Sequence, residues 1–511
     1  MPSLMIRNLQ TVVTCDDADS VLSQVDLYCE GGVLRAMGPD LPQTADTVLD
    51  GSRCIAYPGL VNTHHHLYQV FSRNLPQVQN LELFGWLTAL YEIWKGLDRE
   101  VVRLSSLTGM GELMKHGCTT CFDHHYVFPQ GAGDLLEAQF AAAEELGIRM
   151  HASRGSMDLS RKDGGLPPDS VVQTVDEILA DSRRCIETYH DPSFGSMRQV
   201  ALAPCSPFSV SADLLRQSAL LARQYGVRLH THVAETKDEE NYTLTRCGVR
   251  PLEYMASLGW TGSDVWYAHG IHFNDEELRE LARTGTGVAH CPISNMKLSS
   301  GVARIPEMLC LGVPVGLAVD GSASNDGSSL LEELRVCYLL HRLTASAQAP
   351  SGYDVLKMAT RGSARLLGRD DIGQLSVGKC ADLFLVDSRR LELVGGLYDP
   401  NRGPPGPGGL HRGQRPCHRP GGAARHRGRA RPGREGPGLL RRVPGEDLRW
   451  SAASPSWWGT SRPPTPRPSS TPRMRPSPEA AGWMPPSTLR RDRNWPPPAP
   501  LSPPAPPGKF G

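Results

Sequence analysis

From Tyr57 onward, apolar runs of strand length alternate with amphipathic helical patterns, and this alternation constrains the fold more than any other feature of the chain. Helical patterns fit at Ser105–His116, Leu135–Leu146, Ser211–Tyr225 and Asn274–Arg283, the last with the capping-box spacing of Asn274 and Glu277. Eight strand-helix units predict an α/β fold of the (β/α)8 TIM-barrel type, although the alternation alone equally permits a doubly wound open sheet. The eight strand candidates are Ala56–Asn62, Cys118–Asp123, Arg149–Ser153, Val200–Pro204, Arg228–His232, Val265–His269, Val288–Cys291 and Val315–Asp320.

The two flanks of this region have a different pattern. Residues 4–57 consist of short β-like runs separated by turns such as Glu30-Gly31-Gly32, which predicts a small antiparallel sheet. Residues 371–387 return to short β runs, and we expect them to pair with the N-terminal strands. The predicted organisation is a small β-sandwich domain built from residues 1–57 and 368–400, with the metal-dependent barrel over residues 58–367 between its two parts.

Residues 401–511 differ sharply in composition from the rest. They hold 20 of the 54 basic residues, 5 of the 54 acidic residues and 26 of the 43 prolines, which gives a charge of about +15 against about −15 for the first 400 residues. This composition predicts a disordered tail. Because the change is abrupt after Tyr398-Asp399-Pro400, we favour a frameshift near residue 401 over a basic extension that binds nucleic acid, for which the aromatic residues are sparse and unpatterned.

The remaining composition points to a cytoplasmic protein. The N-terminus lacks the basic start and apolar core of a signal peptide, and the chain has no apolar run long enough to predict a membrane span. The 13 cysteines have no paired spacing, as is typical of reduced thiols.

Polar residues recur where the predicted strands end, which is where barrel enzymes carry their active sites. His64 and His66 close the first strand, with His65 between them pointing away, because alternate residues of a strand share a face. His232 closes the fifth strand and Asp320 the eighth. Three imidazoles and one carboxylate suit a divalent metal and leave a position for water, whose pKa the metal lowers towards about 7. We therefore predict a metal site at His64, His66, His232 and Asp320.

The strand-end motifs together resemble those of the amidohydrolase superfamily over residues 4 to about 400. Strand four ends without the lysine of the two-metal type, so the resemblance is to the one-metal aminohydrolase branch. The matching segments are Pro58-Gly59-Leu60-Val61-Asn62-Thr63-His64-His65-His66, His230-Thr231-His232-Val233-Ala234-Glu235, Ala268-His269-Gly270, Ala289-His290-Cys291-Pro292-Ile293-Ser294-Asn295, Val319-Asp320-Gly321 and Ile372-Gly373-Gln374-Leu375 with Gly378-Lys379-Cys380-Ala381-Asp382-Leu383.

The resemblance implies hydrolytic deamination of a cyclic amidine by metal-activated hydroxide. It assigns Glu235 to protonate the ring nitrogen, His269 to polarise near the attacking oxygen, and Asp320 to bind the metal and relay the water proton to the leaving ammonia. It implies one divalent ion, zinc first, with iron or manganese as alternatives, and it leaves the oligomeric state open, a homo-oligomer being common in the family.

Several segments look like those of the 8-oxoguanine deaminases, which convert that purine to urate and ammonia. Among them are Glu82-Leu83-Phe84-Gly85-Trp86-Leu87 and His124-His125 with the residues before them. On this basis Gln69, Arg73 and Trp86 are predicted substrate contacts, through amide hydrogen bonds, a carbonyl contact and ring stacking. The alternatives are a triazine aminohydrolase or chlorohydrolase, a guanine or adenosine-type deaminase, and a barrel that binds metal or purine without turnover.

Overall fold

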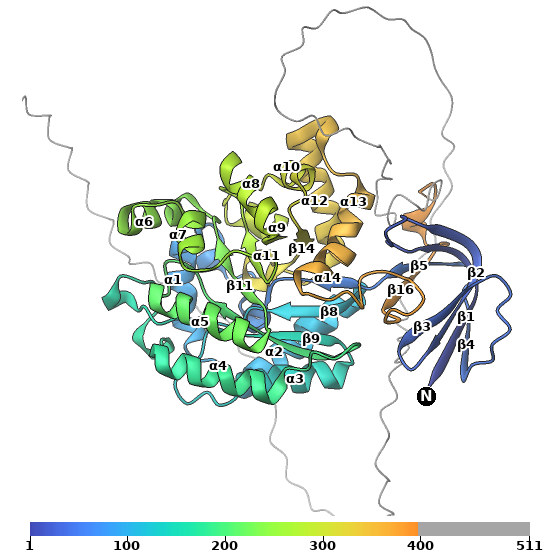
Figure 1. The fold of residues 1–511 in the computed structure, drawn as a ribbon, viewed down its shortest axis with the longest axis horizontal. Helices are drawn as coiled ribbons and strands as arrows, with labels where there is room; N and C mark the ends of the chain where they lie inside the picture. The colour runs from blue at the N-terminus through green and yellow to red at the C-terminus, as the bar shows by residue number, and fades with distance from the viewer. Residues whose placement is uncertain (397–511) are drawn as a thin grey trace, which may run out of the picture. The chain divides into compact units, whose positions relative to one another are not determined.

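A central barrel of parallel strands organises the chain, as the computed structural model shows for residues 1–396, the part that the structure describes (Figure 1). Each strand pairs in parallel with the next along the chain. The barrel strands are β6 (Leu60–Asn62), β8 (Cys118–Asp123), β9 (Arg149–Ser156), β10 (Arg198–Pro204), β11 (Leu229–Val233), β12 (Val265–His269), β13 (Gly287–His290) and β14 (Val315–Leu317).

The barrel closes between its first and last strands, which confirms the TIM-type prediction over the open sheet. Two short strands that continue them, β7 (His65–His66) and β15 (Asp320–Gly321), pair in parallel. The Asp320 backbone N–H donates to the His64 carbonyl oxygen at 3.1 Å. Closure therefore brings the ends of strands one and eight, with their polar side chains, against one another.

The helices surround the barrel, and their starts follow the capping signals of the sequence. Helix α3 matches its prediction, Ser211 caps α5, and Asn274 and Glu277 form the predicted capping box of α8. Helix α2 begins earlier than Ser105, because Asp98 caps it. The helices are α1 (Leu83–Trp94), α2 (Arg99–Lys115), α3 (Leu135–Leu146), α4 (Val175–Tyr189), α5 (Ala212–Tyr225), α6 (Lys237–Cys247), α7 (Pro251–Ser257), α8 (Asp275–Thr284), α9 (Pro292–Lys297), α10 (Ile305–Leu311), α11 (Ser322–Asn325), α12 (Leu330–Ala345), α13 (Gly352–Lys357) and α14 (Ser363–Leu366).

A second sheet is built from both flanks of the barrel region. Its six strands are β1 (Ser3–Val13), β2 (Val21–Glu30), β3 (Val33–Gly38), β4 (Thr47–Asp50), β5 (Cys54–Pro58) and β16 (Leu383–Asp387). Strand β16 pairs antiparallel with β5, as expected of the C-terminal return. The all-antiparallel prediction was wrong for β4 and β5, which run parallel to β1 because the chain crosses from β3 to the other side of β1 before they form.

The predicted strand Ala56–Asn62 is in fact two strands in different sheets. Strand β5 ends at Pro58 in the small sheet and β6 begins at Leu60 in the barrel. Gly59 joins them with its backbone against Thr119, where any Cβ would collide with the threonine side chain. The periodicity hides this break because both pieces are apolar and buried.

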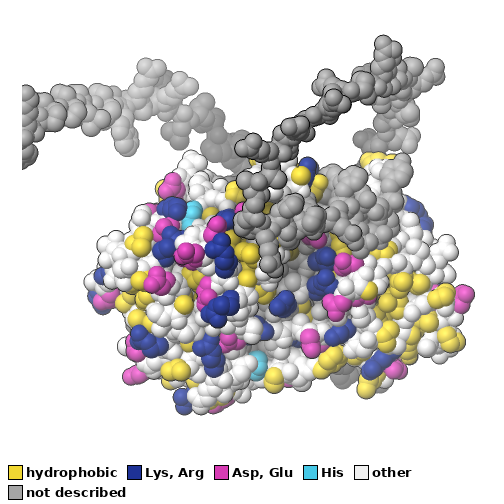
Figure 2. Space-filling view, turned by 45° about the horizontal axis from the view of Figure 1, so that its top comes forward, with side chains coloured by type: hydrophobic (Ala, Val, Ile, Leu, Met, Phe, Trp, Pro, Cys, Tyr) yellow, Lys and Arg dark blue, Asp and Glu magenta, His cyan; other side chains and the backbone are white. Residues whose placement is uncertain are grey.

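The described surface mixes both signs of charge. On the face drawn in Figure 2, basic and acidic side chains are interspersed. Among residues 1–396, many charged side chains form ion pairs, such as Arg304 with Asp275. Within residues 1–396, no helix is long and apolar enough to cross a membrane. The predicted disordered tail and the frameshift hypothesis fall on residues 401–511, outside the described part.

Candidate metal centre and active site

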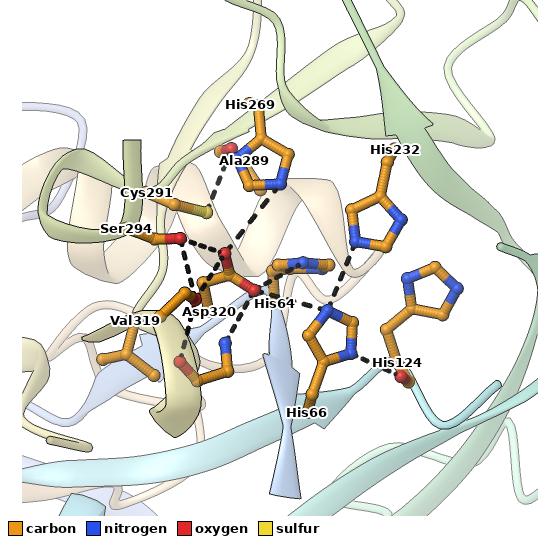
Figure 3. Close-up of polar contacts among 12 residues, drawn as sticks. His64, His66, His124, His232, His269, Ala289, Cys291, Ser294, Val319 and Asp320 are labelled. Atoms are coloured by element: carbon orange, nitrogen blue, oxygen red, sulfur yellow. Dashed lines mark hydrogen bonds and ion pairs between the residues drawn. The ribbon is translucent and has the colours of Figure 1, made fainter. Parts of the chain in front are cut away.

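Side chains from strands one, five and eight converge at the carboxyl end of the barrel (Figure 3). Asp320 Oδ1 lies 3.3 Å from Nε2 of both His64 and His66, and His66 Nε2 lies 3.2 Å from His232 Nε2. All four side chains are buried. The structure thus brings together the four residues that the sequence analysis assigned to a metal.

The opposite nitrogen of each imidazole is anchored, and the anchors fix the tautomers. His66 Nδ1 donates to the His124 carbonyl at 2.7 Å, and His232 Nδ1 donates to the Cys205 carbonyl at 2.6 Å. His64 Nδ1 lies 2.8 Å from His230 Nε2, which accepts because His230 Nδ1 donates to the Trp266 carbonyl. All three Nε2 atoms therefore present lone pairs to the same point, as ligand histidines do.

The electrostatics of these groups suit a cation. Burial lowers the pKa of His66 and His232 well below the usual value, so both rings are neutral. Burial alone would raise the pKa of Asp320, but the neighbouring His64, His269 and His66 outweigh it and hold that pKa well below its ordinary range. His64 Nε2 makes no hydrogen bond within residues 1–396 although it is fully buried. Three neutral nitrogens and one carboxylate fit a divalent metal ion.

The carboxylate of Asp320 is held by contacts that the sequence analysis missed. Ser294 Oγ donates to its Oδ2 at 2.5 Å, and the Gly321 N–H donates to its Oδ1 at 2.6 Å. Asp320 itself adopts a left-handed backbone conformation, with φ of 61°. Such strain in a non-glycine residue is typical of functional sites, where surrounding contacts over-determine the conformation. The motif that contains Ser294 was noted in the sequence, but serine at a helix start has an ordinary capping role and gave no separate signal.

Glu235 and His269 lie next to Asp320 and line the same cavity. Glu235 Oε2 is 3.6 Å from His269 Nε2, which is 4.0 Å from Asp320 Oδ2. Burial raises the pKa of Glu235 to about 7. Burial alone would lower the pKa of His269, but the carboxylates of Glu235 and Asp320 outweigh it and raise that pKa. His269 Nδ1 donates to Asn295 Oδ1 at 2.8 Å, which fixes the ring.

A buried carboxylate holds the backbone that carries Glu235. Glu239, in the first turn of α6, accepts from the Ala234 N–H at 2.8 Å and from the Glu235 N–H at 3.1 Å. Ala234 has a φ of 56°, in the left-handed region. Glu239 is fully buried although the charged run Lys237-Asp238-Glu239-Glu240 suggests a solvated helix start. It stabilises the kink that turns Glu235 towards His269.

A cavity of about 370 Å³, counted with the solvent at its mouth, opens onto these groups. Its walls combine seven apolar or aromatic side chains with eight polar ones. They include four residues that the sequence analysis did not single out: Tyr126, Cys205, Phe208 and Leu298. The lining is completed by His66, Gln69, Leu83, Trp86, Leu87, Ser206, His232, Glu235, His269, Asp320 and Ser324.

Two of the three predicted substrate contacts line the cavity. Gln69 Oε1 and Trp86 Nε1 are buried there without a hydrogen-bond partner among residues 1–396. Arg73, the third, is not among the residues that line the cavity, and its contact with substrate stays a prediction. Its Nη2 donates to Glu112 Oε2 at 2.7 Å and to two serine hydroxyls, because Arg73 follows the short helix Leu67–Ser72 and turns towards α2.

Comparison with known proteins agrees with this geometry. Residues 55–403 match the model of the amidohydrolase family. The chain is 47% identical over 403 residues to 8-oxoguanine deaminase of Pseudomonas aeruginosa, covering 78% of this chain and 89% of that protein. It is 41% identical over 416 residues to hydroxydechloroatrazine ethylaminohydrolase of Pseudomonas sp. (strain ADP), covering 78% and 86%.

A solved structure with the same fold carries a metal. The crystal structure of atrazine chlorohydrolase from Arthrobacter aurescens TC1 complexed with zinc has a TM-score of 0.76 and 35% identity, and the match covers 78% of this chain and 90% of that one. A closed barrel, strand-end imidazoles around one carboxylate and a family match over most of the described residues agree with one another, and the chain belongs to the amidohydrolase family.

Proposed function

We propose that the protein hydrolyses the amino group from an aminated purine, 8-oxoguanine first among them, to give urate and ammonia. One observation carries this proposal. Two carboxyl groups face the same cavity, and their surroundings push their pKa values apart, Glu235 to about 7 and Asp320 well below its usual range. Such a pair supplies an acid and a base at neutral pH.

The proposed metal ligands are Nε2 of His64, His66 and His232 together with Oδ1 of Asp320. Zinc is the first choice, since the similar atrazine chlorohydrolase structure contains it, with iron or manganese as alternatives. A divalent ion in this position lowers the pKa of water and so supplies hydroxide at neutral pH.

The protein's own groups move the protons. Glu235 donates its proton to the ring nitrogen beside the amino-bearing carbon, which avoids a ring anion when oxygen adds. Asp320 accepts the proton of the attacking water at Oδ2 and passes it to the departing amino group, which leaves as ammonia. Glu235 then regains its proton from the hydroxyl group added to the ring. The Nε2 atom of His269 lies between the two carboxyl groups, and its N–H donates a hydrogen bond towards the added oxygen.

Substrate recognition is assigned to the two unpartnered cavity groups. The Gln69 amide both donates and accepts, and the Trp86 indole N–H donates. A purine with oxo groups offers carbonyl oxygens and ring N–H groups that match them. The apolar walls from Leu83, Leu87 and Phe208 suit a planar ring.

A second candidate is hydrolysis of a triazine, favoured by the relative that acts on hydroxydechloroatrazine and by the triazine hydrolase structures. Both reactions use the same acid and base, so the cavity contacts decide between them. The presence of both Glu235 and Asp320 disfavours the remaining alternative, a barrel that binds metal or purine without turnover.

A substrate panel tests the proposal. Zinc-loaded protein is assayed for ammonia release from 8-oxoguanine, guanine, isocytosine and hydroxylated triazines, with Glu235→Gln as the matched inactive variant. We expect the highest kcat/KM for 8-oxoguanine, with loss of about 10²- to 10⁴-fold in the variant. A triazine as the best substrate would transfer the assignment to the second candidate. No turnover of any member would refute both.

A further inference from the structure

A second cluster of metal-ligand side chains lies outside the cavity, between the barrel and α12. It consists of His290 at the end of β13 with Cys337 and His341, which are four residues apart on α12 and so share one face. All three are buried, with at most 1% of their surface exposed. Their donor atoms lie within 4.8 Å of one another.

This cluster is separate from the active site. Ala289 and Cys291, on either side of His290, pack in the barrel-interior cluster with residues of the other strands. Because alternate residues of a strand point to opposite faces, His290 points outward, towards α12. None of the three residues lines the cavity.

The two imidazoles have the geometry of a ligand pair. His290 Nε2 lies 3.2 Å from His341 Nε2, the same distance that separates His66 Nε2 from His232 Nε2 in the candidate metal centre. The Nδ1 atoms of both rings lack a hydrogen-bond partner among residues 1–396. Without an ion, the pair shares one proton between the Nε2 atoms and leaves one N–H and one lone pair unsatisfied. With an ion, both Nε2 lone pairs are used, and each Nδ1 carries the proton of its neutral ring, so two buried N–H groups take the place of one N–H and one lone pair.

We propose that His290, Cys337 and His341 bind a second metal ion, a thiophilic d10 ion, either Zn²⁺ or Cu⁺. Thiolate with imidazole is a ligand set that such ions prefer. On binding, the Cys337 thiol loses its proton to solvent as the metal–sulfur bond forms. Cu⁺ with one thiolate and two neutral imidazoles is an uncharged unit, which a buried site accommodates without a further ligand, whereas Zn²⁺ keeps a positive charge and a fourth position.

A metal ion in this site would hold α12 against the barrel, behind the active site. It joins α12 to β13, directly before α9 (Pro292–Lys297), which carries Ser294 and Asn295. Those residues hold Asp320 and His269. Glu333, one turn before Cys337 on α12, already joins α12 to α9 by accepting a hydrogen bond from the Ile293 N–H.

The test counts metal ions and identifies the ligand sulfur. Metal-free protein is reloaded with Co²⁺ as a spectroscopic substitute for zinc, and separately titrated with Cu⁺ without oxygen against a colorimetric Cu⁺ chelator. Cys337→Ser removes the sulfur, and Cys185→Ser is the matched control because Cys185 is also a buried helix cysteine, outside every metal-ligand group found among residues 1–396.

We expect one ion more in wild type and in Cys185→Ser than in Cys337→Ser, and a near-ultraviolet thiolate-to-cobalt band that Cys337→Ser lacks. Binding of the extra ion only as Cu⁺ supports the site and assigns the ion. If Cys337→Ser does not fold, His341→Asn replaces it, and the cobalt band of wild type still reports on thiolate. Equal metal content in all proteins for both ions, with no thiolate band, overturns the proposal and leaves a histidine pair that shares a proton.

Discussion

Replacing Glu239 by Gln should slow the reaction although Glu239 does not line the cavity. The two oxygens of the Glu239 carboxyl group accept two backbone N–H groups, from Ala234 and Glu235, although burial raises the pKa of this carboxyl to about 8. A glutamine side chain has the same shape but one acceptor oxygen, so one buried N–H loses its partner and faces an amide NH₂ group instead.

The magnitude follows from that lost contact. Leaving a buried donor unsatisfied costs about 1–3 kcal/mol. If the backbone at the left-handed Ala234 relaxes to avoid this cost, the conformation that aims Glu235 at His269 loses the same free energy. A free-energy difference of that size corresponds to a fall in kcat of about 5- to 150-fold. We expect KM to change much less, because Gln69 and Trp86 are not touched.

The assay compares kcat, KM and zinc content of Glu239→Gln with those of wild type. Asp238→Asn is the control, since Asp238 is the exposed neighbour in the same helical turn. The control should match wild type. A wild-type kcat in Glu239→Gln would refute the positioning role. A zinc content that falls, or a KM that rises, in the same proportion as kcat falls would indicate general damage to the site instead.

Three further predictions follow from the geometry. Because Glu235 must carry a proton and burial raises its pKa to about 7, kcat/KM should fall as the pH rises above about 7, where this carboxyl ionises; a profile that stays flat to pH 9, about two units above, would contradict the acid role. Gln69→Ala should lower kcat/KM for 8-oxoguanine by about 5- to 150-fold, because one buried hydrogen-bonding group is lost, while the zinc content of the protein stays unchanged. An unaffected kcat/KM would remove Gln69 from the substrate contacts. Gly59→Ala should lower the free energy of unfolding in urea by about 1–3 kcal/mol because its Cβ collides with Thr119, whereas Gly111→Ala in α2, whose Cβ meets no described atom within 4 Å, should raise it by about 0.5–1 kcal/mol; equal stability of the two variants would argue against the strand junction.

The sequence was most informative where the signal is local. Strand β8, helix α3 and the caps at Ser211 and Asn274 follow from periodicity and from side chains a few residues apart. The convergence of His64, His66, His232 and Asp320 was also foreseeable, since the strands of a barrel end at one rim.

Features that depend on packing between distant segments were not foreseeable. No residue near Arg73 in the sequence indicates that its guanidinium binds Glu112, a partner that lies outside the cavity lining. The split of the first predicted strand depends on Thr119, which the chain brings against Gly59 only after folding. Glu239 looks like one more charge in an acidic run until the structure shows its burial and its two N–H partners.

The central claim is hydrolysis of the purine amino group in a site that depends on one metal and on Glu235. Its most direct test is mass spectrometry of the product formed from 8-oxoguanine by the zinc-loaded protein in water enriched in the heavy oxygen isotope. We predict urate with one labelled oxygen and one equivalent of ammonia, none of either from metal-depleted protein, and formation slower by about 10²- to 10⁴-fold with Glu235→Gln. Failure of the zinc-loaded protein to form urate, or urate without the label, would contradict the account.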